Sequence, residues 1–260
     1  MSLIRHSGES GGGEERRKTE QEWRQEIIHV CRLMWQKDYV AASDGNVSVR
    51  LGEDRYLVTP SGFSKGFLEP DQLLVIDGDA EPVGPRYGSA RHLRVSSEIL
   101  LHLEAYKRRP DVFSVLHAHP PTAIALSIAG ISLARCVLPE VMMSFGLIPT
   151  TAYATPASAE GAKVIAGLIE SYDALILRRH GSVTVGKSAW DAYLKLERLE
   201  HAAMITKTIV QLGGETPLPP EEAAKLAEWR AERGLLVGTQ AEDLCQACGV
   251  CHVPDARRQR

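Results

Sequence analysis

Three histidines have a spacing that suits a metal ion. His117 and His119 lie two residues apart at the end of a predicted strand, where alternate side chains point to the same side. His180 ends a second apolar segment and directly precedes Gly181, at which backbone can approach closely. Three imidazoles would leave one position of a tetrahedral zinc ion open, as is typical of catalytic zinc. The spacing alone does not show that His180 meets the pair, and half-buried strand histidines with hydrogen-bonded rings give the same pattern.

A carboxylate and several small polar residues accompany the histidines. Glu98 follows Ser96 and Ser97, one of which is expected to cap a helix, so Glu98 is predicted in a first helical turn, where acidic residues are commonly caps. Hydroxyls, an amide and free backbone N–H groups suit a phosphate dianion without a basic cluster, although the same types are ordinary in turns. The candidate phosphate ligands are Ser43, Asn46, Ser61, Gly62, Ser96 and Ser97.

The elements that must position these residues can be read from hydrophobic periodicity. Strands are predicted within residues 47–51, 55–62, 72–79, 111–120 and 174–186. Helices are predicted over residues 20–37, 95–110, 121–130, 155–170, 189–212 and 220–233. Several strands are separated only by turns. The pattern therefore favours an α/β fold built as a three-layer α/β/α sandwich with a mainly antiparallel central sheet over a doubly wound fold.

Length and composition set the domain organisation and exclude several classes of protein. The 260 residues suit one domain with extra residues at both ends. We expect a flexible N-terminal arm over 1–19, a folded domain over 20–215, and a C-terminal helix and cysteine-containing tail over 216–260. The net charge of −3 argues against nucleic acid as a partner. The chain shows no apolar run long enough for a membrane span and no secretory signal, so a cytoplasmic protein is predicted.

The tail holds the one unusual group of cysteines. Cys245, Cys248, Cys251 and His252 could bind a structural zinc ion, or the three thiols an iron–sulfur cluster. Such sites normally pair two separated halves of sequence, whereas this run is contiguous and terminal. An exposed, oxidisable tail is therefore the favoured interpretation.

Six segments carry a resemblance to a known family. In order and spacing they resemble the class II aldolase/adducin family, in the branch that contains L-fuculose-1-phosphate aldolase. The segments are SDGNVSVR (43–50), VTPSG (58–62), SSE (96–98), RPDVFSVLHAHP (109–120), YATP (153–156) and RRHG (178–181). The resemblance implies an α/β/α sandwich assembled as a homotetramer, with active sites at subunit interfaces.

The resemblance also implies roles for the residues singled out above. His117, His119 and His180 would hold one divalent metal per subunit, with zinc favoured and manganese, cobalt or iron as alternatives. Glu98 would be the proton-transfer carboxylate. The small polar residues match the family's phosphate-binding positions.

One position departs from the family pattern. The resemblance implies a tyrosine nineteen residues beyond the second ligand, where this chain has Leu138. Glu140 is the nearest ionisable side chain. It would serve as an acid for the leaving aldehyde oxygen only if it were buried with a raised pKa, and a surface or interface glutamate is the alternative.

The function implied by the resemblance is a metal-dependent aldolase. It would cleave a phosphorylated ketose, or a related small sugar acid, between carbons 3 and 4 through a metal-stabilised enediolate, giving dihydroxyacetone phosphate and an aldehyde. A dehydratase or a decarboxylase of a related sugar phosphate is the enzymatic alternative. A non-enzymatic adducin-like binding module is the third hypothesis, against which the three histidines and Glu98 argue.

Overall fold

The computed structural model describes residues 18–84 and 92–235. The predicted arm up to residue 17 and the cysteine tail from residue 236 lie outside the described residues. The helices are α1 (Glu20–Gln36), α2 (Ile99–Arg108), α3 (Pro121–Ala129), α4 (Pro139–Phe145), α5 (Ala159–Lys163), α6 (Ala166–Ile169), α7 (Ala189–Gln211) and α8 (Pro220–Glu232). The strands are β1 (Asn46–Gly52), β2 (Arg55–Val58), β3 (Leu74–Ile76), β4 (Ser114–Ala118), β5 (Ala174–Leu177) and β6 (Gly181–Gly186).

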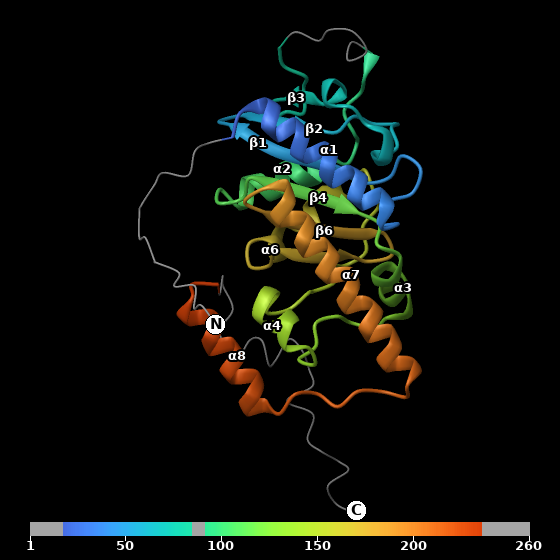
Figure 1. Cartoon of the computed structure of the whole chain (residues 1–260), viewed down its shortest axis with the longest axis vertical. Coiled ribbons are helices and arrows are strands. Elements are labelled where there is room, and N and C mark those ends of the chain that lie inside the picture. The colour runs from blue at the N-terminus through green and yellow to red at the C-terminus, as the bar shows by residue number, and fades with distance from the viewer. Residues whose placement is uncertain (1–17, 85–91, 236–260) are drawn as a thin grey trace, which may run out of the picture.

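The strands form one six-stranded sheet in the order β3-β2-β1-β4-β6-β5, and every neighbouring pair is antiparallel. Helices α1 and α7 cover one face, in front of the sheet in Figure 1, and α2 lies behind it. Alternate residues of β4 serve the two layers: Leu116 packs in the core beneath α1 and α7, and Val115 packs against α2. The predicted three-layer sandwich with an antiparallel sheet is confirmed.

Helix α7 fixes the chain just after the two neighbouring histidines. Its Glu200 is buried, and the carboxylate accepts hydrogen bonds from the backbone N–H groups of Thr122 and Ala123 at 2.8 and 3.0 Å. These groups belong to the first turn of α3, whose N–H groups have no partner within the helix. The anchor therefore holds the start of α3, and with it the end of β4, against the long helix.

Two segments differ from their predicted form. Residues 174–186 were predicted as one strand, but they form the hairpin of β5 and β6, in which Arg179 takes a left-handed φ of 60°. The polar residues at 178–180 mark the turn, but the buried apolar segments on either side were joined into one predicted strand. Residues 155–170 were predicted as one helix and contain the separate short helices α5 and α6; Gly161 and Gly167 both lower helix propensity there. Helix α4 was not predicted.

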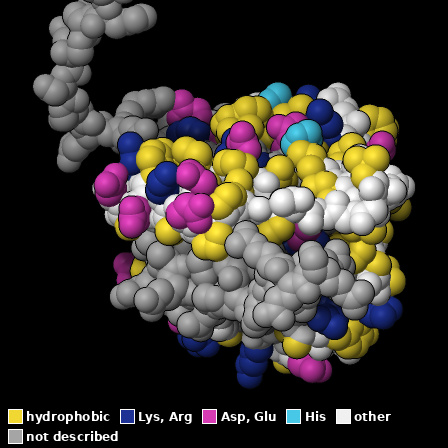
Figure 2. Space-filling view, turned by 90° about the horizontal axis from the view of Figure 1, so that it is seen from below, with side chains coloured by type: hydrophobic (Ala, Val, Ile, Leu, Met, Phe, Trp, Pro, Cys, Tyr) yellow, Lys and Arg dark blue, Asp and Glu magenta, His cyan; other side chains and the backbone are white. Residues whose placement is uncertain are grey.

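The surface seen in Figure 2 carries mixed side chains. On the described part of this face, basic and acidic side chains are interspersed with hydrophobic ones. None of the helices within residues 18–84 and 92–235 has the length and apolar composition required to cross a membrane.

Candidate active site

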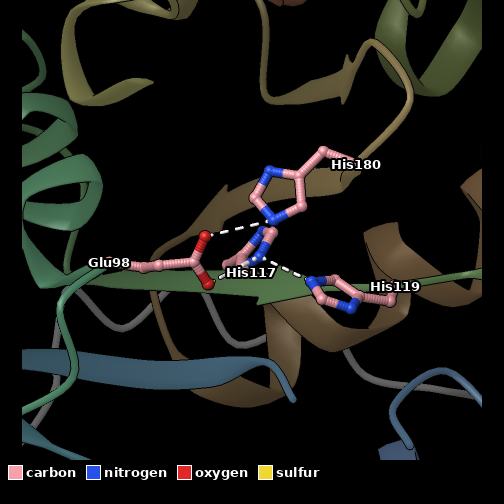
Figure 3. A group of neighbouring side chains, drawn as sticks. All are labelled: Glu98, His117, His119 and His180. Atoms are coloured by element: carbon pink, nitrogen blue, oxygen red, sulfur yellow. Dashed lines mark hydrogen bonds and ion pairs between the residues drawn. The ribbon is translucent and has the colours of Figure 1, made fainter. Parts of the chain in front are cut away.

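Four side chains from three separate segments converge beside the end of β4 (Figure 3). The ligand atoms of Glu98, His117, His119 and His180 all lie within 4.8 Å of one another. The Nε2 atoms of His117 and His119 are 3.0 Å apart. The two oxygens of Glu98 lie 3.2 Å from Nε2 of His117 and 3.1 Å from Nε2 of His180. The structure thus brings His180 to the neighbouring pair, which spacing alone could not show.

Close packing of strand ends makes this convergence possible. A Cβ atom on Gly181 would lie 2.4 Å from the Ala118 carbonyl oxygen and 2.9 Å from the rings of both His117 and His119. Only glycine can therefore follow His180 here without displacing the other two imidazoles. The backbone N–H of His119 donates to the Tyr39 carbonyl at 2.8 Å, which fixes the chain beyond β4.

Hydrogen bonds set the orientation of two of the rings. Nδ1 of His117 lies 2.9 Å from the Ser182 carbonyl oxygen, which can only accept, so Nδ1 carries the proton and Nε2 is left as an acceptor. Nδ1 of His119 faces the Asp44 carboxylate at 3.2 Å in the same way. Backbone carbonyls and carboxylates are the usual partners that orient metal-binding histidines.

The donor set fits a divalent cation. With both Nδ1 atoms protonated, two Nε2 lone pairs face each other across 3.0 Å, which is unfavourable unless a proton or cation lies between them. Bonds of about 2.0–2.1 Å in tetrahedral geometry separate zinc ligands by roughly 3.3 Å, close to the observed spacings. Within the described ranges, no second group of three or more potential ligands occurs.

The protonation states also suit a cation. Burial tends to raise the pKa of Glu98, but without a bound cation, protons on the facing Nε2 atoms of His117 and His180 outweigh burial and hold this pKa well below its usual range. A cation would take the place of these protons. Burial, with the neighbouring imidazoles His117 and His180, lowers the pKa of His119 to about 4. An ionised carboxylate beside a neutral imidazole is the combination that binds a metal ion.

The prediction that Glu98 lies in the first turn of a helix is wrong. Helix α2 begins at Ile99, so Glu98 is its N-cap residue, and its side chain makes no capping bond. The Ser96 hydroxyl accepts from the Glu98 N–H at 3.3 Å and thereby caps the preceding turn. The carboxylate is consequently free to point toward the imidazoles rather than back along the helix.

The candidate phosphate ligands lie on adjacent loops. The Asn46 side-chain amide at the start of β1 donates to the Ser96 hydroxyl at 3.3 Å, and its buried Oδ1 has no partner. The Ser61 N–H, beyond β2, donates to the Arg94 carbonyl at 2.8 Å. These bonds bring Asn46, Ser61 and Ser96 into one neighbourhood. The exposed members of the set are Ser43, Ser61, Gly62 and Ser97.

A buried lysine beneath two of these loops escaped the sequence analysis. The Nζ of Lys65 donates to the carbonyls of Ser43 and Phe63 at 3.0 and 2.9 Å, although the residue is only 1% exposed. Burial lowers its pKa. A single lysine in a polar turn looks like a surface residue, so no sequence signal marks it.

Glu140 stands apart from the cluster. It lies exposed in the first turn of α4, so the burial that an acid role requires is absent in this chain. Leu138 caps α4 and packs on the hydrophobic cluster around Ile148.

Comparisons with known proteins agree with this geometry. Residues 25–206 match the family model described as Class II Aldolase and Adducin N-terminal domain. An L-fuculose phosphate aldolase of Methanococcus maripaludis is 34% identical over 180 residues, covering 69% of this chain and 93% of the relative. The 3-oxo-tetronate 4-phosphate decarboxylase of Escherichia coli K12 is 30% identical over 218 residues, covering 82% of this chain and 98% of the relative.

Solved structures of similar proteins superpose on this chain. An L-fuculose 1-phosphate aldolase superposes with a TM-score of 0.72 at 25% identity, covering 83% of this chain and 99% of the other. YgbL from Escherichia coli, described as a candidate aldolase, epimerase or decarboxylase, gives 0.70 at 30% identity, with 80% and 99% covered.

Proposed function

This chain belongs to the class II aldolase and adducin family, and from that premise we propose that it is a metal-dependent lyase that cleaves a carbon–carbon bond in a small phosphorylated sugar or sugar acid. The observation that carries the proposal is the convergence of three imidazoles and one carboxylate within 4.8 Å. An adducin-like binding module would have no need of that convergence.

His117, His119 and His180 would hold the cation. Three imidazoles suit zinc, with manganese, cobalt and iron as alternatives. When bound, the ion supplies Lewis acidity that stabilises negative charge developing on substrate oxygens, a contribution of several kcal/mol.

Glu98 is proposed to move the proton at the reacting carbon. Its carboxylate lies 3.1–3.2 Å from the Nε2 atoms of His180 and His117, so it borders the same space that the cation and substrate oxygens would share. Cleavage of the bond between carbons 3 and 4 leaves its electron pair on carbon 3 as an enediolate. Glu98 would deliver the proton that carbon 3 then needs to give dihydroxyacetone phosphate.

The loops around Asn46, Ser61 and Ser96 are the proposed phosphate site, with Ser43, Gly62 and Ser97 at its rim. The contacts that support it are those joining Asn46 to Ser96 and Ser61 to Arg94. The unpaired Asn46 Oδ1 cannot itself donate to a phosphate, so the amide N–H, the hydroxyls and backbone N–H groups would do so. Lys65 adds positive charge beneath these loops.

Decarboxylation is the second candidate, and Leu138 favours it. Loss of carbon dioxide from a phosphorylated 3-oxo acid leaves the same enediolate. It needs no group to take a hydroxyl proton, whereas aldol cleavage must remove the proton of the carbon-4 hydroxyl. Position 138 cannot supply that group, and Glu140 is exposed. In the aldolase reading, a group from a neighbouring subunit of the proposed cytoplasmic homotetramer completes the site.

Product analysis with Glu98→Gln tests the proposal. Zinc-loaded wild-type enzyme is incubated with ketose 1-phosphates and with 3-oxo-tetronate 4-phosphate. Two carbonyl fragments identify an aldolase, carbon dioxide a decarboxylase, and a diketone a dehydratase. Glu98→Gln is expected to lower turnover by about 10²–10⁴-fold while zinc stays bound to the three histidines. Glu53→Gln, at an exposed turn position, is the matched control. Near-normal turnover by Glu98→Gln would contradict the mechanism.

A further inference from the structure

The strand order sets the parts of the site in a row. Asn46 of β1 pairs with His117 of β4, and His117 pairs with Val183 of β6. The proposed phosphate loops therefore lie on the β1–β2 side of the histidine cluster. The turn between β5 and β6 lies on the opposite side of β4. Its distance from β4 is at least one strand spacing, about 4.8 Å. A substrate whose phosphate binds the loops would extend its other end toward this turn.

A cavity extends toward that opposite side. Its wall includes Ser97 at the rim of the proposed phosphate loops, Glu98 and His180 from the cluster, and Arg178 from the β5–β6 turn. The rest of the wall is largely apolar, with Leu100, Leu101 and Leu177 among its residues. Arg178 also borders a second hollow beside Ser127 and Thr150. Apart from His180, Arg178 is the basic residue among those that line the first cavity.

Arg178 is exposed at the mouth of the first cavity and has no counter-ion among the residues that the structure describes. Arg109 and Arg135, by contrast, pair with carboxylates at 2.7–3.0 Å. Even Glu98, which lines the same cavity, directs its oxygens to His117 and His180 rather than to Arg178. The backbone N–H of Arg178 donates to the Thr151 hydroxyl oxygen at 3.4 Å.

From this arrangement we infer that Arg178 binds a carboxylate at the end of the substrate away from the phosphate; the inference rests on the proposed function. A guanidinium presents two parallel N–H groups that match a carboxylate, which makes arginine well suited to this ligand. The substrate class is then a phosphorylated keto sugar acid rather than a neutral ketose phosphate.

The same ion pair bears on the reaction. Pairing with Arg178 stabilises the ionised carboxylate, and so opposes its discharge as carbon dioxide. The bound carboxylate is therefore retained. The bond between carbons 3 and 4 breaks, and its electron pair goes to the enediolate. The carbon-4 hydroxyl gives its proton to the group that a neighbouring subunit supplies in the proposed homotetramer and becomes an aldehyde, and Glu98 delivers a proton to carbon 3. The products are dihydroxyacetone phosphate and an aldehyde that bears the carboxylate.

Two ligands that differ only in a carboxylate test the inference. 4-Phosphooxybutanoate carries a phosphate and a carboxylate on a four-carbon chain, and n-butyl phosphate lacks the carboxylate. Calorimetry on the zinc-loaded full chain is expected to show about tenfold tighter binding of the first ligand, a difference of roughly 1.4 kcal/mol. Arg178→Gln is expected to remove this preference and to leave the affinity for n-butyl phosphate unchanged. Arg179→Gln changes the adjacent arginine, which is exposed like Arg178 but does not line the cavity, and is expected to keep the preference for the carboxylate ligand.

Three results would overturn the inference. Equal binding of both ligands by the wild type would show that no carboxylate subsite exists. A preference that survives in Arg178→Gln would place the carboxylate elsewhere, such as on the metal ion. Weaker binding of both ligands by Arg178→Gln would show that Arg178 binds the phosphate instead of the carboxylate. Since binding is measured without turnover, an inactive protein that keeps the Arg178-dependent preference refutes the lyase proposal alone.

Discussion

The histidine cluster and the proposed phosphate loops are held in contrasting ways. His117 is fully buried in β4, and its ring is oriented by the Ser182 carbonyl of the next strand. The loops instead expose Ser43, Ser61 and Gly62, and the buried Lys65 joins two of them through backbone carbonyls. One region is fixed by the sheet, the other by Lys65 and by a few hydrogen bonds between loops, such as those from Asn46 to Ser96 and from Ser61 to Arg94.

This difference separates binding of the cation from binding of the substrate. Strand pairing holds His117, and His119 and His180 directly adjoin paired strands, so little order would be lost when the proposed cation binds. The exposed loop residues can adjust around a phosphate, so part of the binding free energy is spent on ordering them. Substitutions in the histidine cluster should therefore change zinc affinity, and substitutions in the phosphate loops should change KM for the phosphorylated substrate.

Loss of a metal-facing ring gives the largest expected effect. His117→Ala should abolish stoichiometric zinc binding and lower turnover by at least about 10³-fold, because the several kcal/mol supplied by a Lewis acid are lost. Zinc content by mass spectrometry and turnover are measured together. His119→Ala, at a less buried ring, should give the same result without disturbing the sheet. His201→Ala, at an exposed position of α7, is the control. Full zinc occupancy in both cluster variants would contradict the assignment.

Asp44→Asn should have a smaller effect in the same region. The Asp44 carboxylate faces Nδ1 of His119 at 3.2 Å, and loss of its charge weakens that ring as a ligand. Zinc affinity, measured by competition with a chelating dye, should fall about 10–100-fold, with KM for substrate little changed at saturating zinc. Asp71→Asn, exposed elsewhere on the surface, should bind zinc normally. Unchanged affinity in Asp44→Asn would show that this contact does not orient the ligand.

Lys65→Met should affect the other region and has the smallest expected effect. One charge interaction of about 1–2 kcal/mol is removed, so KM for the phosphorylated substrate should rise about tenfold, with kcat and zinc content near wild type. Activity toward the unphosphorylated analogue should not change, which distinguishes loss of phosphate binding from general damage. Lys107→Met, at an exposed position near the end of α2, is the control. Equal losses on both substrates would assign Lys65 a purely structural role.

Much of the fold could be predicted from periodicity, and the failures have local causes. Helices α1 and α7 begin at capping residues Thr19 and Ser188 and bury regular apolar stripes, so pattern and structure agree. The hairpin of β5 and β6 was missed although the polar residues at 178–180 mark its turn, because the buried segments on either side were joined into one predicted strand.

The site was predictable as a set of residue types but not as an arrangement. Spacing placed His117 and His119 on one side of a strand, yet only the pairing of β4 with β6 brings His180 to them. Lys65 gave no signal, and Arg178 stood in the RRHG segment without a role of its own, since burial of a lysine and the absence of a counter-ion are properties of the folded chain.

X-ray absorption at the zinc edge tests the central claim most directly. One equivalent of zinc is added to the full chain, and the ligands around it are counted by element and distance. The account predicts three imidazole nitrogens with the remaining position taken by oxygen, at about 2.0–2.1 Å. Sulfur neighbours at about 2.3 Å, as the cysteines of the tail would supply, or fewer than three imidazoles would contradict it.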